Sequence, residues 1–151
     1  MSTGAANTEA QRAGCDLAIV GACKAAEVAY DDFTLTVAAG SYPCLPTITV
    51  GTARTFDETD LLALYIYGRL VAFGFGALRA GEYACRVHAA LRANGNARHV
   101  SIALNGDGGK RVVVDRAVPS PATATLLEKI EFDVTAIREL LKGRVETDDE
   151  E

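Results

Sequence analysis

The stretch that decides the fold is Leu61 to Asn94, LLALYIYGRLVAFGFGALRAGEYACRVHAALRAN, the most apolar and aromatic part of the chain. We predict that its first half, Leu61 to Phe75, is a long buried β-strand, because Leu, Tyr, Ile, Val and Phe suit a pleated, half-buried surface. Alternation gives this strand a core face of Leu62, Leu64, Ile66, Leu70 and Ala72. The other face is amphipathic and carries Tyr65, Tyr67, Arg69, Val71 and Phe73.

A membrane-spanning helix is the rival interpretation of the same stretch. Leu61 to Leu78 is eighteen residues long with one charge, Arg69, which is near the lower limit for crossing a bilayer. An arginine at the bilayer centre costs at least ~2.5 kcal/mol, and Asp57, Glu58 and Asp60 stand just before the stretch. We therefore favour the strand and expect no membrane partner.

The second half of the stretch has the pattern of an amphipathic helix. From Ala80 to Ala93, one apolar stripe is formed by Tyr83, Val87, Ala90 and Leu91. Asn94 and Gly95 tolerate the left-handed conformation at a helix end. We predict a helix that ends at this dipeptide.

Composition predicts one folded domain. The chain has 151 residues, 49% of them hydrophobic, and a net charge of -5, enough for a real core. Its last six residues, ETDDEE, hold five acids, so the remainder is neutral. We expect a domain over residues 1–144, beginning with a flexible arm (1–7), and a disordered acidic tail (145–151). No cluster of Lys and Arg indicates recognition of nucleic acid.

The four cysteines, Cys15, Cys23, Cys44 and Cys85, include no C-x-x-C pair. Cys15 and Cys23 are eight residues apart on a predicted helix, about 12 Å along its axis, which is too far for a disulfide. Buried free thiols, typical of a reducing compartment, are therefore expected.

The remaining elements complete an α+β fold. A helix is predicted from about Thr8 to Tyr30, and a short one over Ala136 to Lys142. The further strands are predicted at Phe33 to Val37, Thr47 to Val50, His99 to Leu104, Lys110 to Arg116 and Ile130 to Val134. The Asn-Gly and Asp-Gly dipeptides between the third and fourth of these indicate a hairpin. The order α-β-β-β-α-β-β-β predicts a mostly antiparallel sheet with two helices on one face, followed by the short C-terminal helix.

No group of residues predicts catalysis, a cofactor or a metal. Asn105 to Lys110, NGDGGK, lacks the spacing of a phosphate-binding loop and is explained by a hairpin turn. His88 and His99 have no partner at the spacing of metal ligands. We expect a protein that is not an enzyme. Arg69 between aromatic residues is the most unusual feature, and arginine and tyrosine are enriched at protein interfaces.

The order of parts resembles the tail-terminator and neck (tail-completion) proteins of long-tailed bacteriophages. The residues that carry the resemblance are Tyr42-Pro43, Leu45 to Val50, Leu64 to Arg69, Ala80 to Ala84, Val87 to Leu91 and Lys129 to Val134. It implies a structural, ring-forming virion subunit, commonly a hexamer, that joins head and tail through other connector or tail-tube proteins. It would be assembled in the host cytoplasm. The expected interface residues are Tyr65, Tyr67, Arg69, Phe73 and, on the following helix, Arg86.

A different class of function stays open. The chain could instead be a small cytoplasmic ligand-binding domain or enzyme, with a pocket near Tyr65, Arg69 and His88.

Overall fold

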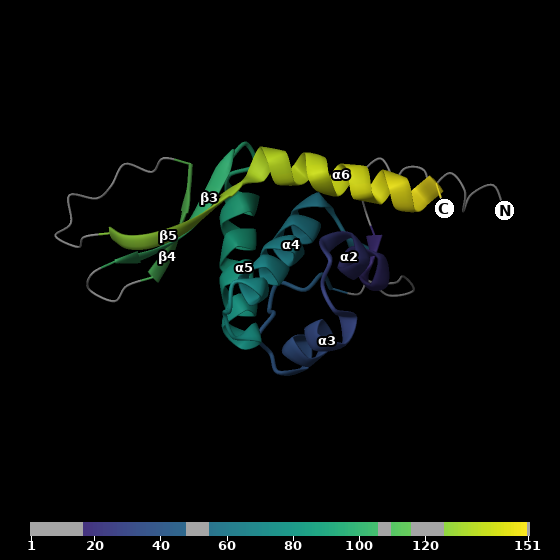
Figure 1. Cartoon of the computed structure of the whole chain (residues 1–151), viewed down its shortest axis with the longest axis horizontal. Coiled ribbons are helices and arrows are strands. Elements are labelled where there is room, and N and C mark those ends of the chain that lie inside the picture. Colours follow the sequence, from purple (N-terminus) through teal and green to yellow (C-terminus); the bar gives the residue numbers. More distant parts are fainter. Residues whose placement is uncertain (1–16, 48–54, 106–109, 116–125, 151) are drawn as a thin grey trace.

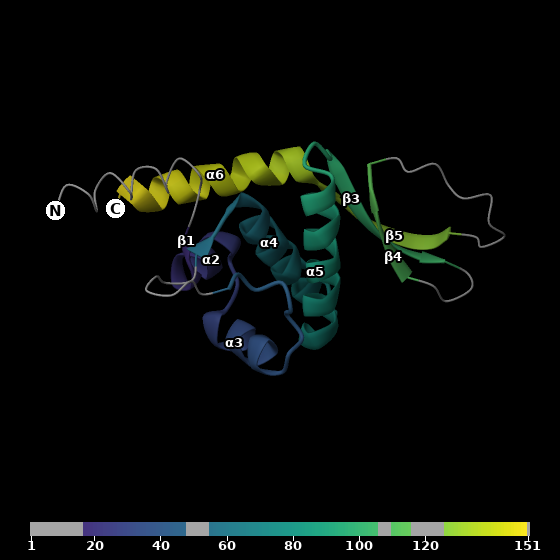
Figure 2. The same ribbon diagram turned by 180° about the vertical axis from the view of Figure 1, so that it is seen from behind.

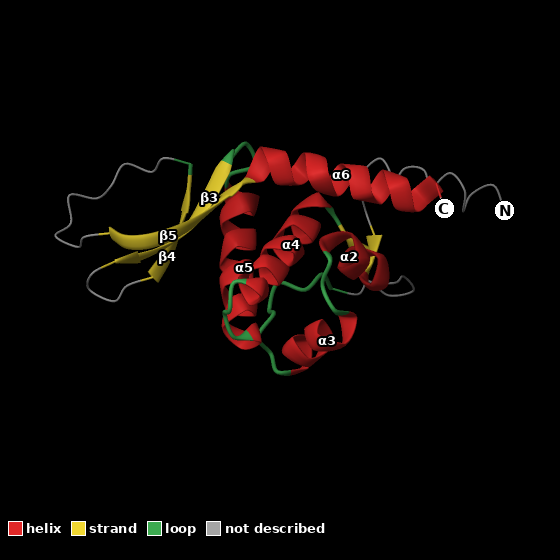
Figure 3. Cartoon of the chain, viewed as in Figure 1, coloured by secondary structure: helices red, strands yellow, loops and turns green. Residues whose placement is uncertain are grey.

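The computed structural model describes residues 17–47, 55–105, 110–115 and 126–150, which form five helices and two small antiparallel sheets. The mixed α+β class is confirmed (Figures 1 and 3). In chain order the elements are β1 (Leu17–Ala18), α2 (Ile19–Ala26), α3 (Tyr30–Ala38), β2 (Thr55–Phe56), α4 (Glu58–Ala72), α5 (Ala77–Ala93), β3 (His99–Asn105), β4 (Lys110–Val114), β5 (Leu126–Asp133) and α6 (Val134–Glu150).

The predicted strand over residues 61–75 is wrong, because this stretch is helix α4. Leu61, Leu62, Leu64, Ile66 and Leu70 are all at most 2% exposed, so several sides of the helix face protein. A helix that is apolar nearly all round carries no clear stripe. Its every-second-residue pattern therefore coincided with that of a buried strand.

Helix α4 begins at a capping box formed by two acids. The carboxylate of Asp57 accepts from the backbone N–H of Asp60 at 2.9 Å, and Asp60 accepts from the backbone N–H of Asp57 at 3.0 Å. Each carboxylate satisfies a donor that a helix start leaves free. These acids, which count against a membrane-spanning helix in the sequence, set the first turn of the central helix.

Helices α2 and α3 replace the long N-terminal helix and the first strand that were expected. Only residues from 17 onward of that helix are described, and α2 ends at Ala26 because Glu27 adopts a left-handed conformation with φ 57°. The predicted strand over residues 33–37 lies within α3. Phe33 and Thr36 are buried, three residues apart as on a helix face. Of the strand predicted over 47–50, Thr47 belongs to no strand and residues 48–50 lie outside the described residues.

Helix α5 is confirmed and begins three residues earlier than expected. It packs along α4, and a disulfide joins its Cys85 to Cys44 in the turn after α3, with the Cα atoms 5.3 Å apart. The expectation of free thiols is wrong for this pair, because folding brings together two cysteines that are 41 residues apart. Cys23 is free and buried, and burial raises the pKa of its thiol to about 11. Cys15 lies outside the described residues.

The predicted hairpin and third strand are confirmed as a three-stranded antiparallel sheet of order β4-β3-β5. Ile102 pairs with Val112 on one side and with Ile130 on the other. Strand β5 is an edge strand, as expected, and the turn residues 106–109 lie outside the described residues.

Helix α6 is longer than the predicted helix over residues 136–142 and continues to Glu150. The expected disordered tail is therefore helical over residues 145–150. Arg144 helps to fix this part of the helix: its Nη1 donates to the carbonyl oxygen of Ala25 at 2.7 Å, and its guanidinium lies 5.9 Å from the ring centre of Tyr65. A cation suits the C-terminal end of α2, where carbonyl groups lack helix partners.

The three-stranded sheet lies at one end of the long axis, beside α5, and the other helices gather around α4 (Figures 1 and 2). Helix α6 starts at the sheet and runs across the helices toward the opposite end (Figure 1). This arrangement differs from the expected sheet backed by two helices, because α4 and not a strand occupies the centre. Among the described residues, no helix is long and apolar enough to span a membrane.

Candidate interaction surface

The five residues predicted to form an interface do not share one surface. Tyr65, Arg69 and Phe73 follow one another at intervals of four along and just after α4, which places them on one side of the helix. Tyr67 is only 2% exposed and lies at a groove between α3, α4 and α5. Arg86 belongs to α5, where its guanidinium lies 5.5 Å from the ring centre of Tyr83.

The three residues of the alternative pocket, Tyr65, Arg69 and His88, each have a different partner among the described residues. Tyr65 faces Arg144 of α6, and Arg69 covers the ring of Phe73 at 5.2 Å, at the end of α4. His88 instead meets Asp60 at the start of α4. Asp60 and Arg69 are nine residues apart, about 13 Å along a helix axis, so these side chains do not converge.

A buried acid links the start of α4 to α5. Asp60 Oδ1 accepts from His88 Nε2 at 2.7 Å and from Arg92 Nη2 at 3.0 Å, while Arg92 also pairs with Asp57 at 2.8 Å. Burial alone would raise the pKa of Asp60, but these hydrogen bonds, the two with Asp57 and the charge of Arg92 lower it. Asp60 therefore remains ionised and joins two helices.

No group of three or more His, Cys, Asp or Glu side chains that could hold an ion occurs in the part of the chain that the structure describes.

Three aromatic rings and a hydrogen bond connect α3 with α4. The rings of Phe33, Tyr42 and Tyr67 meet edge to face, with centres 4.8 to 5.7 Å apart, a favoured geometry for aromatic pairs. The hydroxyl groups of Thr36 and Tyr67 are hydrogen-bonded at 2.9 Å. Burial raises the pKa of both Tyr42 and Tyr67, so both phenols stay neutral at physiological pH.

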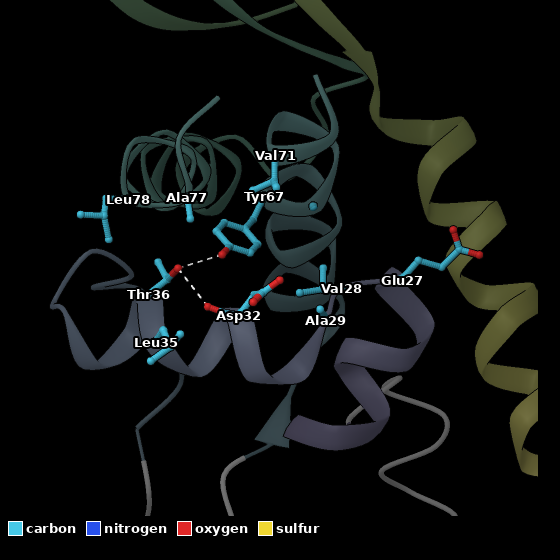
Figure 4. A pocket seen from close by; sticks show the side chains of 11 residues that line it. Glu27, Val28, Ala29, Asp32, Leu35, Thr36, Tyr67, Val71, Ala77 and Leu78 are labelled. Atoms are coloured by element: carbon cyan, nitrogen blue, oxygen red, sulfur yellow. Dashed lines mark hydrogen bonds between the residues drawn. The ribbon is translucent and has the colours of Figure 1, made fainter. Parts of the chain in front are cut away.

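Thr36 and Tyr67 also line an apolar groove of about 310 Å³, which we call the α3 groove (Figure 4). Thr36 and Tyr67 are hydrogen-bonded to each other within it. Three of the groove-lining side chains are large, apolar and exposed: Leu35 (70%), Val71 (40%) and Leu78 (51%). Phe73, at the end of α4, is also 54% exposed. We call these four side chains the apolar rim.

A second pocket, of about 380 Å³, lies between the N-terminal half of α5 and the sheet. Its walls are Phe73, Phe75, Arg79, Tyr83, Ile102, Ala103, Lys110, Glu128, Lys129 and Ile130. Arg79, Lys110 and Glu128 contribute charge to this pocket. Lys129 pairs with Ala103 and Glu128 pairs with Leu104, so the side chains of Lys129 and Glu128 point to opposite faces of the sheet. We call this pocket the basic pocket.

Leu35, Leu78, Arg79, Lys110 and Lys129 were missed by sequence reasoning as surface residues. Leu35 was assigned to a strand, and the others are spread over three elements: Leu78 and Arg79 in α5, Lys110 in β4 and Lys129 in β5. The acids Asp57, Glu58 and Asp60 were the signal in the sequence that α4 is a helix. Acidic residues are typical of the first turn of a helix, so they favour a helix over a strand in the residues that follow.

Comparison of this sequence with known protein families gave no match, and comparison with curated proteins gave none either.

Proposed function

We propose that this chain is a structural subunit that acts by assembling with copies of itself. More specifically, we propose that the copies form a ring at the head–tail junction of a long-tailed bacteriophage, as the sequence resemblance implies. The observation that supports self-assembly is the apolar rim. Its four large apolar side chains are each 40% exposed or more, and three of them, Leu35, Val71 and Leu78, line one groove.

Single exposed apolar residues are ordinary, but a group of them marks a contact surface. Leu35, Val71 and Leu78 come from three different helices and line one groove (Figure 4). Burying them in an interface would release apolar surface from water, which is the main driving force for association. The rim therefore favours a protein partner over a small polar ligand.

The disulfide supports the virion in particular. Disulfides persist outside the cell and on virion surfaces and are rare in a reducing cytosol. The Cys44–Cys85 bridge therefore suits a released particle better than a permanently cytoplasmic domain.

The elements behind the resemblance are only partly those expected. Residues 64–69 are helical rather than extended, whereas residues 80–91 are helical and residues 129–133 form a strand, as the resemblance implies. The phage assignment therefore rests on α5 and β5 together with the disulfide.

The test is the solution mass of variants with a polar rim. We expect Leu35→Ser and Leu78→Ser to weaken self-association by roughly tenfold or more, as for central interface residues, with little change in the unfolding free energy. Val20→Ser on α2 is the matched control, because Val20 is 62% exposed and does not line the groove. Equal association by all three variants would contradict a role for the rim. Co-sedimentation with a purified phage tail-tube protein tests the proposed role at the head–tail junction.

A second candidate function, binding of duplex DNA, is favoured by one observation. Helices α2 and α3 are joined by three residues, 27–29, the first of them left-handed, as in a helix-turn-helix unit. In such units the second helix enters the major groove. Helix α3, YDDFTLTVA, carries two aspartates and no lysine or arginine, so it would meet phosphates with negative charge.

Fluorescence anisotropy with a random-sequence duplex at low salt distinguishes the two candidates. Binding that weakens steeply with added salt would favour the DNA function. We expect no binding.

A further inference from the structure

We propose that the exposed ring of Phe73 and the guanidinium of Arg69 in one copy of the chain insert into the α3 groove of the next copy, where Arg69 pairs with Asp32. We call Arg69 and Phe73 together the α4 knob. The inference rests on the proposed self-assembly and names the two surfaces that meet. The occupant of the groove is therefore a second copy of this chain.

The α3 groove combines apolar walls with negative charge. Leu35, Val71 and Leu78 give it exposed apolar surface. The charged residues that line it are both acids, Glu27 and Asp32. An occupant that fits this groove must therefore be apolar and must also bring a positive charge.

Asp32 is the acid that is placed to receive this charge. Glu27 already pairs with Arg144 at 3.4 Å, whereas no ion pair joins Asp32 to another residue in the described part of the chain. The Asp32 side chain points from α3 toward α4 (Figure 4). Burial and, to a smaller extent, the negative charge of Asp32 raise the pKa of Tyr67 in the groove. A carboxylate in this position can accept two parallel hydrogen bonds from a guanidinium.

The α4 knob has the two properties that the groove requires. Phe73 is 54% exposed, and the guanidinium carbon of Arg69 lies 5.2 Å from its ring centre, a cation–π contact that keeps the charge beside the ring. Among the described residues, the other exposed aromatic side chain is Tyr30. Tyr30 is followed by Asp31 and Asp32, so it would bring further negative charge to an acidic groove.

The knob and the groove face nearly opposite directions on α4. Arg69 and Phe73 each come two residues after a groove residue, Tyr67 and Val71, and two residues turn an α-helix by about 200°. Phe73 is the C-cap residue and keeps right-handed helical dihedral angles. One copy therefore cannot fill its own groove with its own knob. A contact between two different surfaces of identical chains is head-to-tail, and it closes into a ring or continues as a filament.

Charge disfavours the alternative in which the grooves of two copies meet symmetrically. Such a contact would bring Glu27 and Asp32 of both copies into one interface, and like charges oppose association. Insertion of the knob instead places opposite charges together inside an apolar groove, where salt screens them less than on an open surface.

The test is charge reversal in the full chain, followed by light scattering over a concentration series. Asp32→Arg and Arg69→Asp should each associate at least about tenfold more weakly than the original chain, because each brings like charges together. The double variant Asp32→Arg/Arg69→Asp should associate within about threefold of the original chain, because it restores the pair with the signs exchanged.

Asp31→Arg is the matched control. Asp31 lies in the same first turn of α3 as Asp32 but does not line the groove. Both substitutions lose a favourable charge at the helix N-terminus, yet Asp31→Arg should leave association unchanged. Its combination with Arg69→Asp should not recover association.

Phe73→Ser tests the apolar half of the knob without a change of charge. It should associate more weakly than Tyr30→Ser, since Tyr30 is also exposed and does not line the groove. Equal association of these two variants would overturn the inference, as would a double charge variant no stronger than the single ones.

Two further outcomes would overturn it. Unchanged association of both single charge variants would leave the groove to another occupant, such as an apolar cationic peptide. A largest particle of two chains would exclude head-to-tail growth. All of these outcomes leave the proposed self-assembly standing, whereas an original chain that never associates rejects both proposals.

Discussion

At the residue scale, Gly81 shows how closely α5 approaches the segment after α3. A Cβ atom at this position would overlap the backbone carbonyl oxygen of Ser41 and lie 3.1 Å from Cγ2 of Thr36. The obstacle is backbone, which cannot swing aside as a flexible side chain can. Glycine is therefore required here by the packing.

We expect Gly81→Ala to lower the unfolding free energy by about 1–3 kcal/mol, the usual cost of overpacking. Gly143→Ala on α6 is the matched control, because nothing lies within 4 Å of its added Cβ. It should raise the unfolding free energy by about 0.5–1 kcal/mol through helix propensity. Urea unfolding of both variants measures the difference, and equal effects of the same sign would contradict this account.

Asp60 makes stability depend on pH. Its pKa is lowered in the folded chain, so its stabilisation is present above the ordinary value near 3.9 and is lost as the pH falls through the lower, folded value. Asp60→Asn should cost about 2 kcal/mol at pH 7, since it weakens charge-assisted hydrogen bonds.

Urea unfolding at a series of pH values checks this prediction. The difference between the original chain and Asp60→Asn should shrink as the pH falls below about 4. Glu58→Gln is the control, because Glu58 is exposed in the same first turn and makes a surface ion pair with Arg138. A difference that stays constant down to pH 2 would show that the carboxylate charge is not what stabilises the fold.

At the scale of elements, the sequence predicted what local signals specify. The hairpin of β3 and β4 follows from alternating strands around Asn-Gly and Asp-Gly dipeptides, and α5 follows from its apolar stripe. The interpretation of α4 failed because alternation carries no information in a run that is apolar throughout. The length of that run, about fifteen residues, is unusual for a strand and ordinary for a helix.

The α3 groove, the basic pocket and the disulfide could not be predicted from the sequence either. The α3 groove combines residues from α3, α4 and α5, so a wrong type for α3 and α4 hides it. The basic pocket lies between α5 and strands that were predicted correctly, but the sequence does not reveal how these elements meet in space. The Cys44–Cys85 pair was equally inaccessible, because sequence spacing does not reveal which cysteines meet in space.

The disulfide should contribute substantially to the stability of the helical part. It closes a loop of 41 residues, for which the loop-entropy relation gives about 4 kcal/mol. Thermal unfolding with and without a reductant measures this contribution. The Cys44→Ala/Cys85→Ala double variant should be less stable and indifferent to reductant, and a reductant effect of equal size in both proteins would assign it to another site.

At the scale of the whole molecule, the three-stranded sheet lies at one end of the long axis, beside α5, and the other helices gather around α4 (Figure 1). The exposed side chains of Leu35, Val71 and Leu78 belong to the helical part. The proposed self-association would bury apolar area at this surface.

The effect of salt tests whether the apolar rim carries the association. We expect self-association to change little as sodium chloride is raised from 50 mM to 500 mM, because burial of apolar surface is not screened as exposed charges are. Sedimentation velocity measures the association, and its loss at the higher salt concentration would assign the contact to charged groups instead.

The most direct test of the account is the mass of the original chain in solution, measured by light scattering over a concentration series at low salt. We predict a mass that rises from the 15.9 kDa of one chain to a plateau at a whole multiple of it, as expected for a closed ring. A mass of 15.9 kDa at every concentration would contradict the central claim that this protein functions by self-assembly.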